Sequence, residues 1–97
     1  MQFPRIVVNA KAYAEAVGVA GRSLLRGLER VARTGPVALA PPTTELALLG
    51  SKARRVLLFA QHTDPLLPGV GTGFVSAPAV KSAGAVGSIL NHAEHKI

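Results

Sequence analysis

Amide, ammonium, imidazole and carboxylate side chains follow three of the four short apolar runs in this 97-residue chain. The set comprises Asn9 and Lys11 after the first run, Gln61 and His62 after the third, and Asn91, His92 and Glu94 after the fourth. A lysine can bind an anion as a point charge, and a neutral histidine can donate a hydrogen bond to a carbonyl oxygen. One such residue alone is usually a cap or a loop hydrogen bond. Three groups that meet at one place indicate a site.

The elements that must bring these residues together alternate between strands and helices. Compact apolar runs predict strands at residues 5–9, 37–40, 55–60 and 87–91. Helical spacing and breaker residues predict helices at residues 20–33, from Thr43 or Thr44 to Leu49 with Gly50 as the stop, and at 77–83. This alternation predicts an α/β fold with a parallel sheet and right-handed crossovers. It leaves open a small doubly wound sheet or part of a (β/α)8 barrel.

In both architectures the carboxyl ends of the strands share one rim, so the polar residues are expected to lie close together. His92 is expected to begin a further helix, whose positive dipole end would disfavour the imidazolium form. The ring would then stay neutral. Glu94 is expected either to cap that helix or to pair with Lys11.

Metal, nucleotide and disulfide chemistry find little support. The chain has no cysteine, and its histidines lack the spacing of a zinc site. Gly69, Gly71 and Gly73 do not form a GxGxxG pattern, and no GK[ST] follows them. The absence of cysteine and of a long apolar run leads us to expect a cytoplasmic protein that does not bind membranes.

The formal net charge of +6 could favour binding to nucleic acid, to an anionic membrane surface or to a phosphorylated small substrate, or it could belong to a solvated surface. Most of the basic residues are expected to form a solvated surface, with Glu29 pairing with Arg33 on one helix face. The alternative is a small nucleic-acid-binding domain that uses the tight cluster Lys52, Arg54 and Arg55. No aromatic residues are interleaved with the basic ones for base stacking, so we do not expect a nucleic-acid partner.

Three segments, in this order, resemble triosephosphate isomerase of the archaeal type. They are VNAKAY at residues 8–13, AQHTDPLLPGVGTG at 60–73 and AGAVGSILNHAEHKI at 83–97. Each motif is weak alone, but together they cover the chain at matching spacing. One departure is Ala93, where the family has a serine after its histidine.

The resemblance implies a (β/α)8 TIM barrel that interconverts dihydroxyacetone phosphate and glyceraldehyde 3-phosphate without a cofactor. By family likeness, Asn9 and Lys11 bind the substrate, and His92 is the neutral electrophile that is well known in this family. Glu94 is a supporting carboxylate beside Lys11. Thr72 and Gly73, with Gln61, would contact a neighbouring subunit.

Such a barrel takes about 250 residues, so residues 1–97 are expected to supply the N-terminal half, about four β/α units. No acidic residue here follows a strand and precedes a Gly-rich lid, so the general base is missing and the isolated chain is expected to be inactive. The first and fourth strands would each leave an unpaired edge. We therefore expect a homo-oligomer, a complementing C-terminal half, or a non-catalytic half-barrel that only oligomerises.

Overall fold

The computed structural model describes residues 3–65 and 69–96 and contains one parallel four-stranded sheet. The strands are β1 (Ile6–Asn9), β2 (Val37–Ala40), β3 (Leu57–Ala60) and β4 (Ala85–Ser88). Between them lie α1 (Gly18–Val31), α2 (Leu46–Lys52) and α3 (Ala77–Ser82), with the 3-10 turns η1 (Ala14–Ala16) and η2 (Thr43–Glu45) before α1 and α2. The predicted alternation of strands and helices is confirmed.

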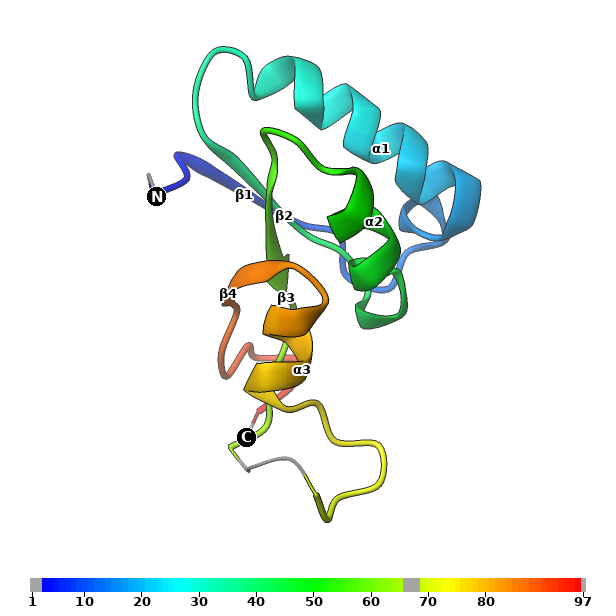
Figure 1. Cartoon of the computed structure of the whole chain (residues 1–97), viewed down its shortest axis with the longest axis vertical. Coiled ribbons are helices and arrows are strands. Elements are labelled where there is room, and N and C mark those ends of the chain that lie inside the picture. The colour runs from blue at the N-terminus through cyan, green and yellow to red at the C-terminus, as the bar shows by residue number, and fades with distance from the viewer. Residues whose placement is uncertain (1–2, 66–68, 97) are drawn as a thin grey trace.

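The strand order is β1-β2-β3-β4, the same as the order along the chain. A doubly wound sheet reverses its strand order at a switch point, whereas a barrel adds each new strand beside the last. Figure 1 shows α1, α2 and α3 following one another along the same side of the sheet. The fold is therefore a sector of a (β/α)8 barrel that comprises its first three β/α units and the fourth strand, and the doubly wound alternative is wrong.

The core lies between the sheet and the three helices. Its largest fully buried side chains include Leu39 of β2, Leu58 of β3, and Leu46 and Leu49 of α2. Every residue of β2 is buried, as expected for a parallel strand that is covered on both faces. The helix–sheet packing is built from leucine, valine and alanine, so it does not depend on aromatic residues.

The two outer strands are more exposed. Within the described residues, β1 and β4 each pair on one side only. Ile6 and Val7 of β1 are 52% and 45% exposed, and Val86 of β4 is 48% exposed. The expectation that the first and fourth strands have unpaired edges is thus confirmed for the part of the chain that the structure describes.

The fourth strand begins at Ala85, two residues earlier than predicted. Gly84 adopts a φ of 113°, which lets the chain turn directly from α3 into the strand. Gly87 then packs against the ring of Phe59, where a Cβ would come within 2.9 Å of the ring carbon Cζ. Both glycines serve close packing, and a pattern of apolar residues does not reveal such a role.

Three other local expectations were wrong. No threonine side chain caps α2, because Thr43 and Thr44 lie within the 3-10 turn that precedes it. Gly50 does not stop α2, which continues to Lys52. Residues 92–96 form turns instead of a helix, with the His95 N–H donating to the His92 carbonyl at 2.8 Å.

Glu29 does not form the expected pair with Arg33. Its carboxylate instead accepts hydrogen bonds from the backbone N–H groups of Arg54 at 2.7 Å and Arg55 at 2.8 Å. This contact fastens the segment before β3 to α1. The expected start of α3 is confirmed, since Pro78 lies in its first turn and the Ser76 hydroxyl accepts from the Ala79 N–H.

Within residues 3–65 and 69–96, every helix is too short or too polar to cross a lipid bilayer.

A pair of glycine substitutions tests the packing of α2. A Cβ on Gly50 would collide with the Ala83 carbonyl oxygen, whereas one on Gly27 of α1 meets no atom within 4 Å. We expect Gly50→Ala to lower the free energy of unfolding by about 1–3 kcal/mol. Gly27→Ala should raise it by about 0.5–1 kcal/mol, because alanine is the better helix former. Urea unfolding measures both, and equal gains would contradict the close approach of α2 to residue 83.

Candidate functional site

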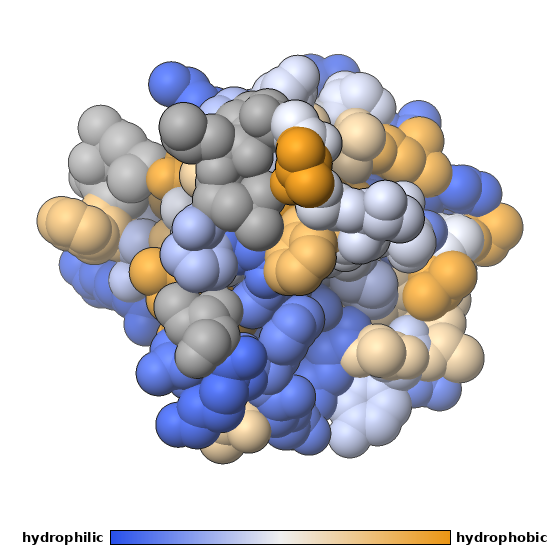
Figure 2. Space-filling view, turned by 90° about the horizontal axis from the view of Figure 1, so that it is seen from below, coloured by the Kyte–Doolittle hydropathy of each residue, from blue (hydrophilic) through white to orange (hydrophobic). Residues whose placement is uncertain are grey.

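A hollow of ≈ 500 Å³ lies where the polar residues after the strands meet. Its lining comprises Asn9, Lys11, Ala12, Tyr13, Thr43, Gln61, His62, Val75, His92, Glu94 and His95. These residues come from segments that follow all four strands, so the predicted convergence at one rim is confirmed. Figure 2 views the molecule from this end and shows hydrophilic residues gathered in its lower part, with hydrophobic residues near the centre and along the margin.

Lys11 is held at this rim by its backbone. Its φ of 51° lies in the left-handed region, which costs a non-glycine residue about 1–2 kcal/mol. Two side chains hold this conformation. The Asn9 carbonyl oxygen Oδ1 accepts from the Lys11 N–H at 3.0 Å, and the Gln61 amide nitrogen Nε2 donates to the Lys11 carbonyl at 2.8 Å. The backbone of Lys11 is therefore held by Asn9, the last residue of β1, and by Gln61, the first residue after β3.

Gln61 also ties this segment to the sheet. The same Nε2 donates to the carbonyl of Ala40, the last residue of β2, at 2.9 Å. One amide group thus links the ends of β1, β2 and β3. The sequence-based role of Gln61 in a subunit contact stays a prediction, because this bridge lies within the chain.

Lys11, His92 and Glu94 form one cluster of ionisable side chains in the hollow. The Lys11 ammonium nitrogen lies 3.4 Å from Glu94 Oε1, which confirms the predicted pairing of these two residues. The same carboxylate oxygen lies 3.8 Å from His92 Nδ1. Both partners of the lysine–glutamate pair are partly exposed, so it stabilises the fold by at most about 1 kcal/mol. Its main effect is to orient the ammonium group beside the histidine.

The proposed helix dipole does not act on His92, because no helix follows it in the described residues. A local backbone contact takes its place. The Glu94 N–H donates to His92 Nδ1 at 3.0 Å, and a ring nitrogen that accepts a hydrogen bond carries no proton. The neutral ring therefore holds its proton on Nε2 and can donate from there. Asn91, just before it, has a φ of 54°, so the backbone is constrained here too.

A second group, missed by the sequence reasoning, closes the loop after β3. The Asp64 N–H donates to the Val75 carbonyl at 2.7 Å, and the Val75 N–H donates to Asp64 Oδ2 at 2.6 Å. Asp64 Oδ1 lies 2.7 Å from Nε2 of the buried His62. The His62 ring stacks on His95 with their centroids 3.5 Å apart. The His-x-Asp spacing at residues 62–64 was the available signal.

Hydrogen bonding lowers the pKa of Asp64 from its ordinary value of 3.8. The Val75 N–H contributes most and His62 contributes next, and both favour the charged carboxylate. Both oxygens of this carboxylate therefore have hydrogen-bond partners within the loop, and Asp64 is not a candidate general base. Thr72 and Gly73 lie on that loop as exposed residues, Gly73 with a φ of 81°. Their predicted contact with another subunit stays a prediction.

Among the residues that the structure describes, no three His, Cys, Asp or Glu side chains are placed to hold a metal ion. The hollow instead offers a cation, a neutral imidazole donor and a carboxylate at one place. Such a set can hold an anionic substrate and stabilise negative charge that develops on a carbonyl oxygen.

Comparisons with known proteins point to one family. The family model described as triosephosphate isomerase matches residues 4–97. The triosephosphate isomerase of Pyrobaculum arsenaticum is 42% identical over 97% of this chain and 42% of its own length. Those of Caldivirga maquilingensis and Sulfurisphaera tokodaii are 35% and 36% identical over the whole chain, covering 44% and 43% of theirs. The chain therefore spans less than half the length of these relatives.

The hydrogen bonds of Asp64 with Val75 and His62, here called the Asp64 clamp, predict a specific pH dependence of stability. The folded pKa lies below the unfolded value, so the stabilisation is fully present above about pH 4 and is lost as the pH falls through the folded pKa. We expect Asp64→Asn to lower the Tm at pH 7 and the difference from the unmodified chain to shrink below pH 4. Glu15→Gln, at an exposed carboxylate, is the matched control and should leave the Tm unchanged. A Tm difference that stays constant down to pH 2 would rule out the charged clamp.

Proposed function

The chain belongs to the triosephosphate isomerase family, and from this premise we propose that it carries the substrate-polarising side of an enzyme that interconverts dihydroxyacetone phosphate and glyceraldehyde 3-phosphate. The observation that carries the proposal is the placement of Lys11, His92 and Glu94 in one hollow. The three groups come from two segments, residue 11 and residues 92–94, which are distant in the sequence and meet only in the fold.

The chemistry requires a proton to leave one carbon of the triose and return to its neighbour through an enediolate. Lys11 supplies a fixed positive charge that attracts the substrate phosphate and balances the enediolate. His92 donates its Nε2 proton in a hydrogen bond to the substrate carbonyl, since its Nδ1 already accepts from the Glu94 N–H. Glu94 orients both groups. Such preorganised stabilisation of developing charge is commonly the largest contribution to catalysis.

Asn9 and Gln61 act as positioning residues in this proposal. Asn9 holds the Lys11 N–H and Gln61 holds the Lys11 carbonyl, so the ammonium group needs no rearrangement when the substrate binds. Asn9 thus contributes to substrate binding in this proposal by positioning Lys11. No cofactor is required for the proton transfers.

The general base must be a different group. None of the five acidic residues of the chain is placed to act as the base. Glu29, Glu45 and Asp64 accept backbone hydrogen bonds. Glu94 pairs with Lys11, and Glu15 lies exposed on η1. We propose that residues 1–97 are the N-terminal half of the barrel and that the base comes from a complementing half. The cysteine-free composition supports a cytoplasmic enzyme. The exposed Thr72 and Gly73 support assembly as a homo-oligomer.

Isomerase activity is expected only when the barrel is completed. The 97-residue chain alone should give no isomerisation of glyceraldehyde 3-phosphate in a coupled assay. A chimera that replaces the matching segment of the Pyrobaculum arsenaticum relative with this chain should be active. Circular dichroism establishes that the chimera folds, and a folded but inactive chimera would refute the proposed function.

Substitutions in the active chimera test the roles of Lys11 and His92. We expect Lys11→Met and His92→Gln each to lower kcat/KM by about 10²–10³-fold, because each removes a group that stabilises developing negative charge. Lys81→Met, at an exposed lysine of α3, is the matched control and should retain activity. An unchanged kcat/KM in the His92→Gln variant would remove this residue from the mechanism.

A further inference from the structure

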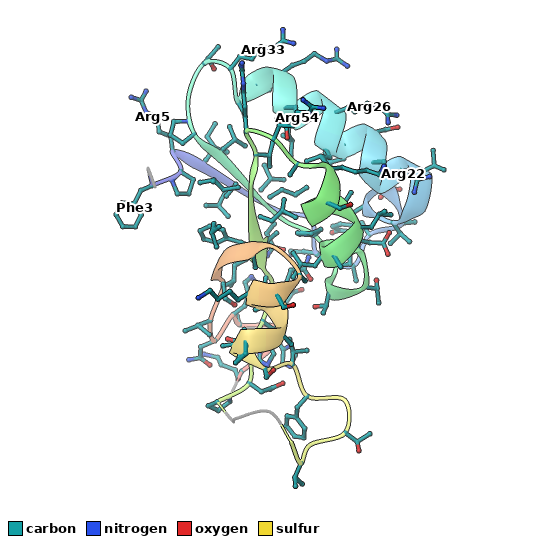
Figure 3. The ribbon with its side chains drawn as sticks, viewed as in Figure 1. Phe3, Arg5, Arg22, Arg26, Arg33 and Arg54 are labelled. Atoms are coloured by element: carbon teal, nitrogen blue, oxygen red, sulfur yellow. The ribbon has the colours of Figure 1, made fainter. Side chains whose placement is uncertain are left out.

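A second hollow, of ≈ 510 Å³, lies between α1 and the segment that leads into β3. One side is lined by Arg22, Arg26, Arg30 and Arg33, and the other by Lys52, Arg54 and Arg55. Figure 3 shows Arg22 and Arg26 along α1, Arg33 in the turn after it, and Arg54 on the neighbouring segment. We call this hollow the arginine groove. It shares no lining residue with the hollow that contains Lys11 and His92.

The arginine groove accounts for the entire net charge of the protein. The chain has eleven basic and five acidic residues, giving +6. Seven of the basic residues and one acid, Glu29, line the groove. The other four basic residues and four acids cancel. The positive charge is therefore concentrated at one place and is not spread over the surface.

Glu29 lowers the net charge of the groove by one, but in the described residues it forms no ion pair with the basic side chains. Its carboxylate accepts from the backbone N–H groups of Arg54 and Arg55 at 2.7 and 2.8 Å, and it also lies 3.3 Å from the Val56 nitrogen. In the part of the chain that the structure describes, the ion pairs involve none of the seven basic groove residues. Glu29 instead holds the second wall of the groove beside α1. Seven like charges in one hollow repel each other, and a bound anion would relieve that repulsion.

The side chains of the groove select the kind of anion. Planar guanidinium groups bind phosphate oxygens with two parallel hydrogen bonds, which an ammonium group cannot do. The volume of the hollow lies in the range of small-molecule sites. No aromatic side chain is among its lining residues, so a nucleobase gains no stacking partner there. These features favour a small ligand with several linked phosphates over a nucleic-acid strand.

We propose that the arginine groove binds a linear chain of three or more phosphates, free or as the triphosphate of a nucleotide. The site is independent of the proposed isomerase reaction, since the two hollows have separate walls. It takes a ligand with several charges because its basic residues occupy two facing walls.

Calorimetry on the 97-residue chain tests the proposal with inorganic tripolyphosphate, at about 0.15 M salt to screen weak surface attraction. We expect tripolyphosphate to bind at least about tenfold more tightly than orthophosphate, since it spans more guanidinium groups. ATP should bind within about threefold of tripolyphosphate, because the base finds no stacking partner, and AMP should bind like orthophosphate. Equal binding of tripolyphosphate and orthophosphate would overturn the proposal. So would tighter binding of a single-stranded oligonucleotide, which would assign the groove to nucleic acid.

Charge reversal then locates the site. Arg30→Glu and Arg54→Glu, one on each wall, should each weaken tripolyphosphate binding by about tenfold or more. Lys81→Glu changes the net charge equally but lies on α3, outside the groove, and should bind as the unmodified chain does. Arg30→Gln and Arg54→Gln serve if a reversed variant does not fold, with a smaller loss expected. Equal losses in the Lys81 variant would show a general charge effect and would exclude a site.

Discussion

The side-chain amide of Gln61 is the contact on which the proposed active site most depends. It donates to the carbonyl of Lys11 and to the carbonyl of Ala40, and so joins the ends of three strands. The contact matters because Lys11 has a left-handed backbone conformation that a lysine does not adopt without support. The sheet thereby transmits its rigidity to a residue that lies beyond the strand. In the proposed function, this support positions the backbone of Lys11 before a ligand binds.

At His92, a hydrogen bond from the neighbouring backbone is found where the sequence predicted the effect of a helix dipole. A helix dipole was expected to keep His92 neutral, yet residues 92–96 form turns. A single N–H from Glu94 meets Nδ1 instead. The hydrogen bond fixes the tautomer directly, whereas a dipole would only shift an equilibrium. The proposed donor role of the ring rests on this contact, and the helix dipole predicted from the sequence was wrong.

Charge divides the molecule into two parts with different chemistry. At the rim beyond the strands, the positive charge of Lys11 is paired with the negative charge of Glu94. The arginine groove contains seven basic residues and an acid that is occupied by backbone donors. Glu29 thus has a structural role, because its carboxylate holds the segment before β3 against α1. The concentration of charge arises because α1 and the segment before β3 pack together, although they are more than twenty residues apart in the sequence.

The sequence by itself determined the alternation of strands and helices, the family and the polar residues that follow each strand. These are local properties, since apolar periodicity and strand ends are written in short segments such as residues 5–9 and 55–60. Only the tertiary structure decided the earlier start of β4, the bridging role of Gln61 and the His62–Asp64–Val75 clamp. Each of these depends on contacts between distant segments: Gly87 against Phe59, one amide against two carbonyls, and one carboxylate against a loop. A single sequence contains the partners of such contacts but not the geometry that selects them, because that geometry arises only when the sheet and its helices pack.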